Sequence, residues 1–273
     1  MTQSSNLLIC FDESGKNSRD PIQLMGALSV PYNIYQHPNY QAFHDLNKEY
    51  SYHWKNYGGD SKSRNGIIKL FELATGLAEY MNFNMIRYKG GDLEKHATDT
   101  FNNIYSNKSE IVDNTIYTKL PERICYGLVR GYGIHNNVQV DILIEDSTEY
   151  HTRQLDKKLK EALNVHSLYR QENFVIHLCE YRSKGQEIGV EFIDIFLGIV
   201  GVILTCPDYE TTSNKKKHQV ELILRLLKKD LLQPYLNNLR LFELQPATQL
   251  YEANIKASVK LFIAKNYSKY IAL

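Results

Sequence analysis

Residues 138–144 (VQVDILI) form the strongest β-strand signal in the sequence. Their β-branched and other apolar side chains favour an extended strand inside a sheet. The segment runs directly into the acidic pair Glu145–Asp146, followed by Ser147 and Thr148. An unpaired charge at the end of a buried strand costs several kcal/mol. This segment therefore predicts both a buried sheet and a polar site at its carboxyl end.

Further strands are expected at 7–12, 23–30, 83–88 and 174–180. Helices are expected from near Gln41, at 66–82, over most of 92–132, at 152–169 and at 187–204, with a basic loop at 214–218 and helix to the end of the chain. The first two strands are a natural antiparallel pair, because the loop between them is rich in turn-forming residues. This order predicts an α/β sandwich with a mixed sheet rather than an alternating Rossmann repeat.

Composition excludes several classes of function. The net charge of +1 gives no global basic field, so binding to nucleic acid would need a local groove. No GxGxxG or GxxxxGK[ST] motif is present, which argues against a dinucleotide site or a P-loop. The four cysteines show no CxxC spacing and predict buried thiols in a reducing compartment. The apolar run at 195–204 is too short to span a bilayer, so we expect a cytoplasmic protein with no membrane partner.

Carboxylates occur where burial is expected: Asp12 and Glu13 after the first strand, Glu145 and Asp146 after the central strand, and Glu191 and Asp194 within the apolar helix. Asp194 is the most informative, because no Lys or Arg lies within one helical turn of it. Glu191, three residues earlier, shares its helical face and adds negative charge instead of cancelling it.

Carboxylates that converge repel one another unless a cation is present. Hard oxygen ligands of this kind suit Mg²⁺ or Mn²⁺, which activate water in phosphodiester cleavage. We expect Asp12, Asp146 and Asp194 to bind the metal. The three neighbouring carboxylates would complete its coordination shell or act as general base: Glu13, Glu145 and Glu191.

Each acidic position also has a purely structural interpretation. Asp12–Glu13, followed by Ser-Gly, can simply begin a turn. Glu145–Asp146 and the two hydroxyl residues after them can begin the next helix. Asp194 can hydrogen-bond a buried tyrosine or a backbone amide.

Four segments resemble, in the expected order, a large prokaryotic family whose members have a domain of unknown function. Its first motif is a strand running into Asp-Glu-Ser-Gly, here LLICFDESGK at 7–16. The others are the His/Lys motif at 53–55 (HWK), the central strand ending in Asp at 140–147 (VDILIEDS), and 183–198 (SKGQEIGVEFIDIFLG).

The resemblance implies a ribonuclease-H-like fold. One domain would cover 1–273, with a helical insertion at about 92–132 and a helical C-terminal extension at about 207–273. By the same resemblance, Asp12, Asp146 and Asp194 match the acidic metal-binding positions. Glu191 departs from the pattern, because the family usually has Gln there.

Candidate substrate contacts lie outside the acidic positions. Ser14 would shape the turn that presents Asp12. His53 and Lys55 would contact phosphate or carry a proton, or else belong to an aromatic loop packed on a helix. The basic run at 214–218 would bind phosphate or form a solvated charged surface through Lys215, Lys216 and Lys217.

These features together predict a Mg²⁺- or Mn²⁺-dependent nuclease. One alternative is a non-catalytic ribonuclease-H-like scaffold or regulatory subunit that binds a protein or nucleic acid. Another is a hydrolase of small phosphorylated molecules. The expected partner is nucleic acid bound in a local groove, and the resemblance also suggests a protein partner in a phage-defence or mobile-element system.

Overall fold

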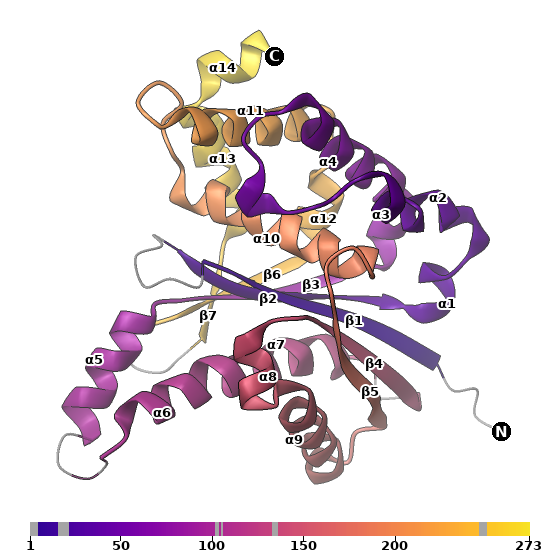
Figure 1. The fold of residues 1–273 in the computed structure, drawn as a ribbon, viewed down its shortest axis with the longest axis vertical. Coiled ribbons are helices and arrows are strands. Elements are labelled where there is room, and N and C mark those ends of the chain that lie inside the picture. Colours follow the sequence, from indigo (N-terminus) through magenta and orange to yellow (C-terminus); the bar gives the residue numbers. More distant parts are fainter. Residues whose placement is uncertain (1–4, 16–21, 102–103, 105, 133–135, 246–249) are drawn as a thin grey trace.

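The computed structural model describes residues 5–15, 22–101, 104, 106–132, 136–245 and 250–273. Its centre is a seven-stranded mixed sheet with the strand order β5-β4-β1-β2-β3-β6-β7 (Figure 1). The strands are β1 (Ser5–Ser14), β2 (Gln23–Pro31), β3 (Asn82–Tyr88), β4 (Val138–Glu145), β5 (Phe174–Arg182), β6 (Leu239–Leu244) and β7 (Leu250–Ala253). The expected α/β class with a mixed sheet is confirmed.

Strand direction divides the sheet. β2 is antiparallel to both of its neighbours, β1 and β3. β4 is parallel to β1, β5 is parallel to β4, and β6 is parallel to β3. Among β1 to β5, β2 therefore runs alone against the others. The antiparallel pairing of the first two strands was predicted and is confirmed.

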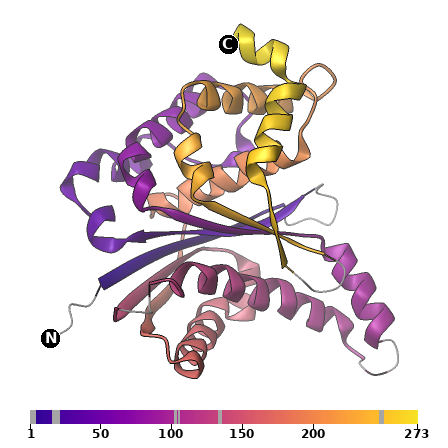
Figure 2. The ribbon, with the colours of Figure 1, turned by 180° about the vertical axis from the view of Figure 1, so that it is seen from behind.

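Helices cover both faces of the sheet (Figures 1 and 2). One face carries α4 (Ser61–Ala74), α10 (Ile188–Thr205), α11 (Asn214–Lys228), α12 (Gln233–Asn237) and α13 (Ile255–Lys265). The other carries α5 (Gly90–Phe101), α6 (Lys108–Asn114), α7 (Leu120–Val129), α8 (Thr148–Arg153) and α9 (Leu155–Arg170). The shorter helices are α1 (Tyr32–Tyr35), α2 (Gln41–His44), α3 (Leu46–Glu49) and α14 (Tyr267–Ala272).

Side chains of β1 alternate between two hydrophobic cores. Leu8 and Cys10 belong to the core beneath α10, whereas Ile9 and Phe11 belong to the core on the opposite face. Successive residues of a strand point to opposite faces. The next residue, Asp12, is therefore directed towards α10, and this alternation positions the site described below.

Helix α10 is the most deeply buried helix of the site. Its 18 residues are on average apolar enough, and the helix is long enough, to cross a membrane, although they include Glu191 and Asp194; 83% of them are buried inside the fold. It packs across β1 and β2 and contacts α11 and α13. A helix that is apolar all round and buried in this way serves as a core helix.

Several expected helix limits are wrong. The helix expected at 66–82 is α4 followed by a 3-10 segment, Thr75–Tyr80. The helix expected at 152–169 is broken at Gln154, whose φ of 52° is left-handed, into α8 and α9. The basic run at 214–218 is the start of α11 rather than a loop, because the Ser213 hydroxyl caps the helix by accepting from the Lys216 amide.

The expectation that the C-terminal region is helical to its end is wrong, because it contains two strands. Strands β6 and β7 extend the sheet beyond β3. Residues of β6 alternate between the cores, with Leu239 and Leu241 on the α10 side and Phe242 and Leu244 on the other. Alternation of side chains between the two faces is typical of a strand and not of a helix.

Packing at Gly198 provides a test of how α10 is seated. A Cβ atom at this position would lie 2.0 Å from two ring atoms of Trp54, the only tryptophan of the chain. Gly198→Ala is expected to displace the indole, lower the free energy of unfolding by about 1–3 kcal/mol and shift Trp54 emission to the red. Urea unfolding followed by fluorescence measures both effects.

Gly91→Ala is the matched control. Gly91 lies in α5, and a Cβ atom there would meet no other atom within 4 Å, so this variant is expected to be neutral or slightly stabilising. Equal stability and emission for the two variants would contradict the close packing of α10 on Trp54.

Candidate active site

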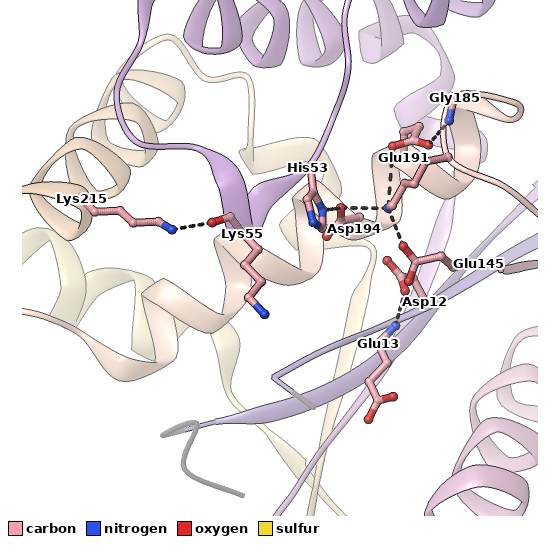
Figure 3. A network of polar contacts seen from close by, with 10 residues as sticks. Asp12, Glu13, His53, Lys55, Glu145, Gly185, Glu191, Asp194 and Lys215 are labelled. Carbon is pink, nitrogen blue, oxygen red and sulfur yellow. Dashed lines mark hydrogen bonds and ion pairs between the residues drawn. The ribbon is translucent and has the colours of Figure 1, made fainter. Parts of the chain in front are cut away.

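The ammonium group of Lys184 lies among the carboxylates of Glu145, Glu191 and Asp194, which are labelled in Figure 3. Its Nζ atom is 2.6 Å from Glu145 Oε1, 3.0 Å from Asp194 Oδ2 and 3.8 Å from Glu191 Oε2. Lys184 belongs to the turn between β5 and α10, Glu145 ends β4, and the other two carboxylates belong to α10. Lys184 thus links its own turn to β4 and α10 at the carboxyl end of β4.

The register of β1 and β4 explains why Asp12 joins this group. The strands are parallel and place Phe11 beside Ile144, so Asp12 and Glu145 follow at the same level. Leu143 and Cys10 share the core beneath α10, and alternation therefore directs Glu145 and Asp12 to that face. α10 lies across the same face and supplies the remaining carboxylates.

Asp12 and Glu145 form a carboxyl–carboxylate pair. Asp12 is only 1% exposed, and burial, followed by its hydrogen bond to Glu145, raises the pKa of Asp12 well above its ordinary value. Burial opposes ionisation of Glu145 as well, but hydrogen bonds from Asp12 and Lys184 outweigh it and lower the pKa of Glu145. Asp12 is therefore the protonated partner, and Glu145 the anion.

Asp194 is held as an anion by Lys184 and His53. Its Oδ2 atom accepts from Lys184 Nζ and lies 3.2 Å from His53 Nδ1. Burial opposes its ionisation, but the hydrogen bonds from His53 and Lys184 prevail and lower the pKa of Asp194. The expectation that negative charge gathers here without compensation is wrong, because Lys184, ten residues earlier, folds back onto α10.

Lys184 remains charged in this setting. Burial acts to lower its pKa, but the four surrounding carboxyl groups, first among them Asp12, outweigh burial and raise the pKa of Lys184. The side chain keeps about a third of its surface exposed. The lysine was not among the predicted site residues, although it lies within the motif at 183–198.

Glu191 is also deeply buried. Its side chain is 2% exposed, and its Oε1 atom accepts a hydrogen bond from the Gly185 amide at 2.7 Å. The other oxygen, Oε2, is buried without a hydrogen-bond partner among the described residues. Burial raises the pKa of Glu191, and Lys184 opposes that rise.

Asp146, expected as a metal ligand, points elsewhere. Its carboxylate contacts His151 Nε2 at 2.7 Å and Ser183 Oγ at 3.0 Å, and its side chain is 39% exposed. The structure thus brings Glu145 rather than Asp146 to Lys184. Ser147 caps α8, which confirms the alternative prediction that residues 145–148 lead into the next helix.

Glu13 faces the opposite side of the sheet. It accepts hydrogen bonds from the hydroxyls of Tyr88 and Tyr150, and only 5% of it is exposed. Figure 3 shows its carboxylate directed away from Asp12 and Glu145. Glu13 is therefore separated from Lys184 by the same alternation that brings Asp12 towards it.

A cavity of about 600 Å³ opens beside the acidic group. Five acidic residues line it: Asp12, Glu145, Asp146, Asp194 and also Glu13, whose carboxylate is bound to tyrosines on the other face of the sheet. Its basic residues are Lys55, Lys215 and Lys216. The lining also includes Ser14, His53 and Trp54.

The basic residues come from two segments that contact each other. Lys215 Nζ donates to the backbone carbonyl of Lys55, which joins the start of α11 to the 3-10 turn Trp54–Asn56. Figure 3 shows Lys55 and Lys215 beyond His53 as seen from the carboxylates. Lys217 lies over the ring of Tyr209, 5.5 Å from its centroid, and is not among the described residues that line the cavity.

The carboxylates on the cavity lining have the chemistry that a hard divalent cation requires. Carboxylate oxygens are the ligands that Mg²⁺ and Mn²⁺ prefer, and Asp12, Glu145 and Asp194 are among the five acidic residues on the cavity lining. In the described ranges, no three His, Cys, Asp or Glu side chains are already arranged as ligands of one ion. The ammonium of Lys184 supplies local positive charge beside these carboxylates.

Comparison with known proteins adds no assignment: the chain matches no protein-family model and no curated protein sequence.

The assignment of charge predicts different effects of two amide substitutions. In Asp12→Asn, the amide can donate to Glu145 as the protonated acid does, so the free energy of unfolding at pH 7 should change by less than about 1 kcal/mol. Asp194→Asn removes the anion that faces Lys184 and His53 and should cost about 1–3 kcal/mol. Urea unfolding in the presence of a chelator measures both changes.

The Asp194 effect should depend on pH. Because the pKa of Asp194 is lowered in the folded protein, its stabilising contribution is present above the ordinary aspartate pKa and is lost as the pH falls through the folded value. The difference between wild type and Asp194→Asn should therefore shrink below about pH 4. Equal losses for the two variants at pH 7 would contradict the protonation of Asp12.

Proposed function

We propose that this protein is a Mg²⁺- or Mn²⁺-dependent phosphodiesterase that cleaves nucleic acid. One observation carries the proposal: Asp12, Glu145 and Asp194, from β1, β4 and α10, converge on a cavity that also has lysines on its wall. Acidic residues that can hold a divalent cation, next to basic residues that can hold phosphate, suit phosphodiester hydrolysis.

The strand order supports a ribonuclease-H-like fold as part of this proposal. The segment β3-β2-β1-β4-β5 of the sheet, with β2 alone antiparallel, is the arrangement typical of that fold. The carboxylates lie on its first strand, at the end of its fourth strand and on a helix that follows its fifth. β6 and β7 are then additions at one edge of the sheet.

Asp12, Glu145 and Asp194 are the residues that would hold the metal. When bound, such an ion lowers the pKa of a coordinated water and stabilises the leaving oxygen. The residues of the chain would have distinct tasks around it: hydrogen bonds already favour the anionic forms of Glu145 and Asp194, and Asp12 would give up its proton to become a ligand.

His53 and the lysines would bind and orient the substrate. His53 lines the cavity, and its Nδ1 atom is engaged by Asp194, which leaves the opposite ring nitrogen to exchange a proton with substrate. Lys55, Lys215 and Lys216 would bind phosphates of the nucleic acid strand. With a net charge of +1, binding depends on these local groups.

A cleavage assay tests the proposed activity. Wild type and Asp194→Asn are incubated with single- and double-stranded DNA and RNA in Mg²⁺, Mn²⁺ or chelator. We expect metal-dependent cleavage by the wild type and a loss of at least about 100-fold in the variant. Trp54 emission checks that both proteins are folded. Intact nucleic acid in every wild-type reaction would contradict the proposal.

Substitution of the lysines tests their separate role. Lys215→Ala combined with Lys216→Ala should weaken nucleic acid binding and reduce the slope of log affinity against log salt by about 2. Hydrolysis of a small phosphodiester such as bis-p-nitrophenyl phosphate should change little. Lys48→Ala is the control, because Lys48 pairs with Asp45 on the surface. An unchanged salt slope would remove these lysines from the binding site.

A further inference from the structure

Lys184 contacts carboxylates that line the cavity, but it is not itself among the described residues of the lining. Asp12, Glu145 and Asp194 are on the described cavity lining, whereas Lys184 and Glu191 are not. Lys184 nevertheless contacts Glu145 and Asp194 at 2.6 and 3.0 Å. It therefore supports these two side chains from outside the described cavity lining.

The contacts of Lys184 engage one oxygen of each of these two carboxylates. Lys184 contacts Oε1 of Glu145 and Oδ2 of Asp194. The second oxygen of each carboxylate, together with the carboxyl group of Asp12, can serve a ligand in the cavity. A ligand bound by these oxygens would leave both contacts of Lys184 intact.

Lys184 is itself held in position. Its neighbour Gly185 has a φ of +80°, a conformation that suits glycine, and donates its amide to Glu191. Glu191 is also the third carboxylate near Lys184, at 3.8 Å. The turn before α10 thus holds the lysine and one of its partners together.

Charge balance limits how many ions the group can hold. The carboxylates around Lys184 carry at most four negative charges, and Lys184 contributes one positive charge. These carboxylates belong to Asp12, Glu145, Glu191 and Asp194. With all four ionised, one divalent ion beside Lys184 leaves a single excess negative charge. Two divalent ions beside Lys184 would make the group positive.

We propose that Lys184 is a resident second cation of this centre, which positions Glu145 and Asp194 and limits the site to one divalent ion. The inference rests on the proposed function, because it assumes that the carboxylates bind a metal. Lys184 acts through the carboxylates and is a positioning residue.

Counting bound Mn²⁺ tests the proposal without an activity assay. The full chain is titrated with Mn²⁺, and free ion is followed by electron paramagnetic resonance. We expect one ion per chain in the wild type and in Lys184→Arg, which keeps the charge. In Lys184→Met we expect two ions and the spectrum of a coupled pair. Lys69→Met, which removes an exposed lysine paired with Glu49, should bind one ion.

The remaining outcomes distinguish a failure of the role of Lys184 from a failure of the metal site itself. Two ions in the wild type, or one or none in a folded Lys184→Met, would overturn the role of Lys184 as the second cation. If Lys184→Met does not fold, Lys184→Gln replaces it under the same criteria. No binding by the wild type, or equal binding by wild type and Asp194→Asn, would instead overturn the metal site on which the proposed function rests.

Discussion

The pairing of Lys184 with carboxylates from β4 and α10 is the interaction on which the site depends. Without a cation, buried anions brought this close would repel one another; a like-charge pair about 4 Å apart costs about 4 kcal/mol at an effective dielectric constant near 20. The lysine, the proton of Asp12 and His53 offset that repulsion. The apolar helix α10 can therefore be buried with two acidic residues on it.

Two geometrical features bring these groups together. Alternation along β1 and β4 sends Asp12 and Glu145 to the face that α10 covers, and it sends Glu13 to the other face. Close packing of Trp54 against Gly198 seats the 53–55 segment on α10. His53 consequently reaches Asp194, while Lys55 meets the start of α11.

The sequence was sufficient to predict the α/β class, five of the strands and the acidic character of the site. Strand alternation also identifies Glu145 rather than Asp146: Leu143 is directed to the α10 core, and Glu145 lies two residues further along the strand. The prediction named Asp146 and did not extend this alternation to the end of the strand, where Glu145 is directed to Lys184 and Asp146 contacts His151 and Ser183. Strands β6 and β7 were missed because short amphipathic segments at a sheet edge give weak signals beside neighbouring helices.

Lys184 could not be predicted from local sequence. Charge pairing within a helix is recognised at spacings of three or four residues, whereas Lys184 lies ten residues before Asp194 and reaches it through a turn. The contact of Lys55 with Lys215 spans 160 residues and likewise has no local signal. Such contacts follow from the assembled sheet and the helices that cover it.

The central claim is that Asp12, Glu145 and Asp194 hold a divalent cation beside Lys184. Anomalous diffraction from crystals soaked in Mn²⁺ tests it most directly. The account predicts one anomalous peak within coordination distance of these three carboxylates, with Lys184 still contacting Glu145 and Asp194. No peak there, or a peak at the position of a displaced Lys184 ammonium, would contradict it.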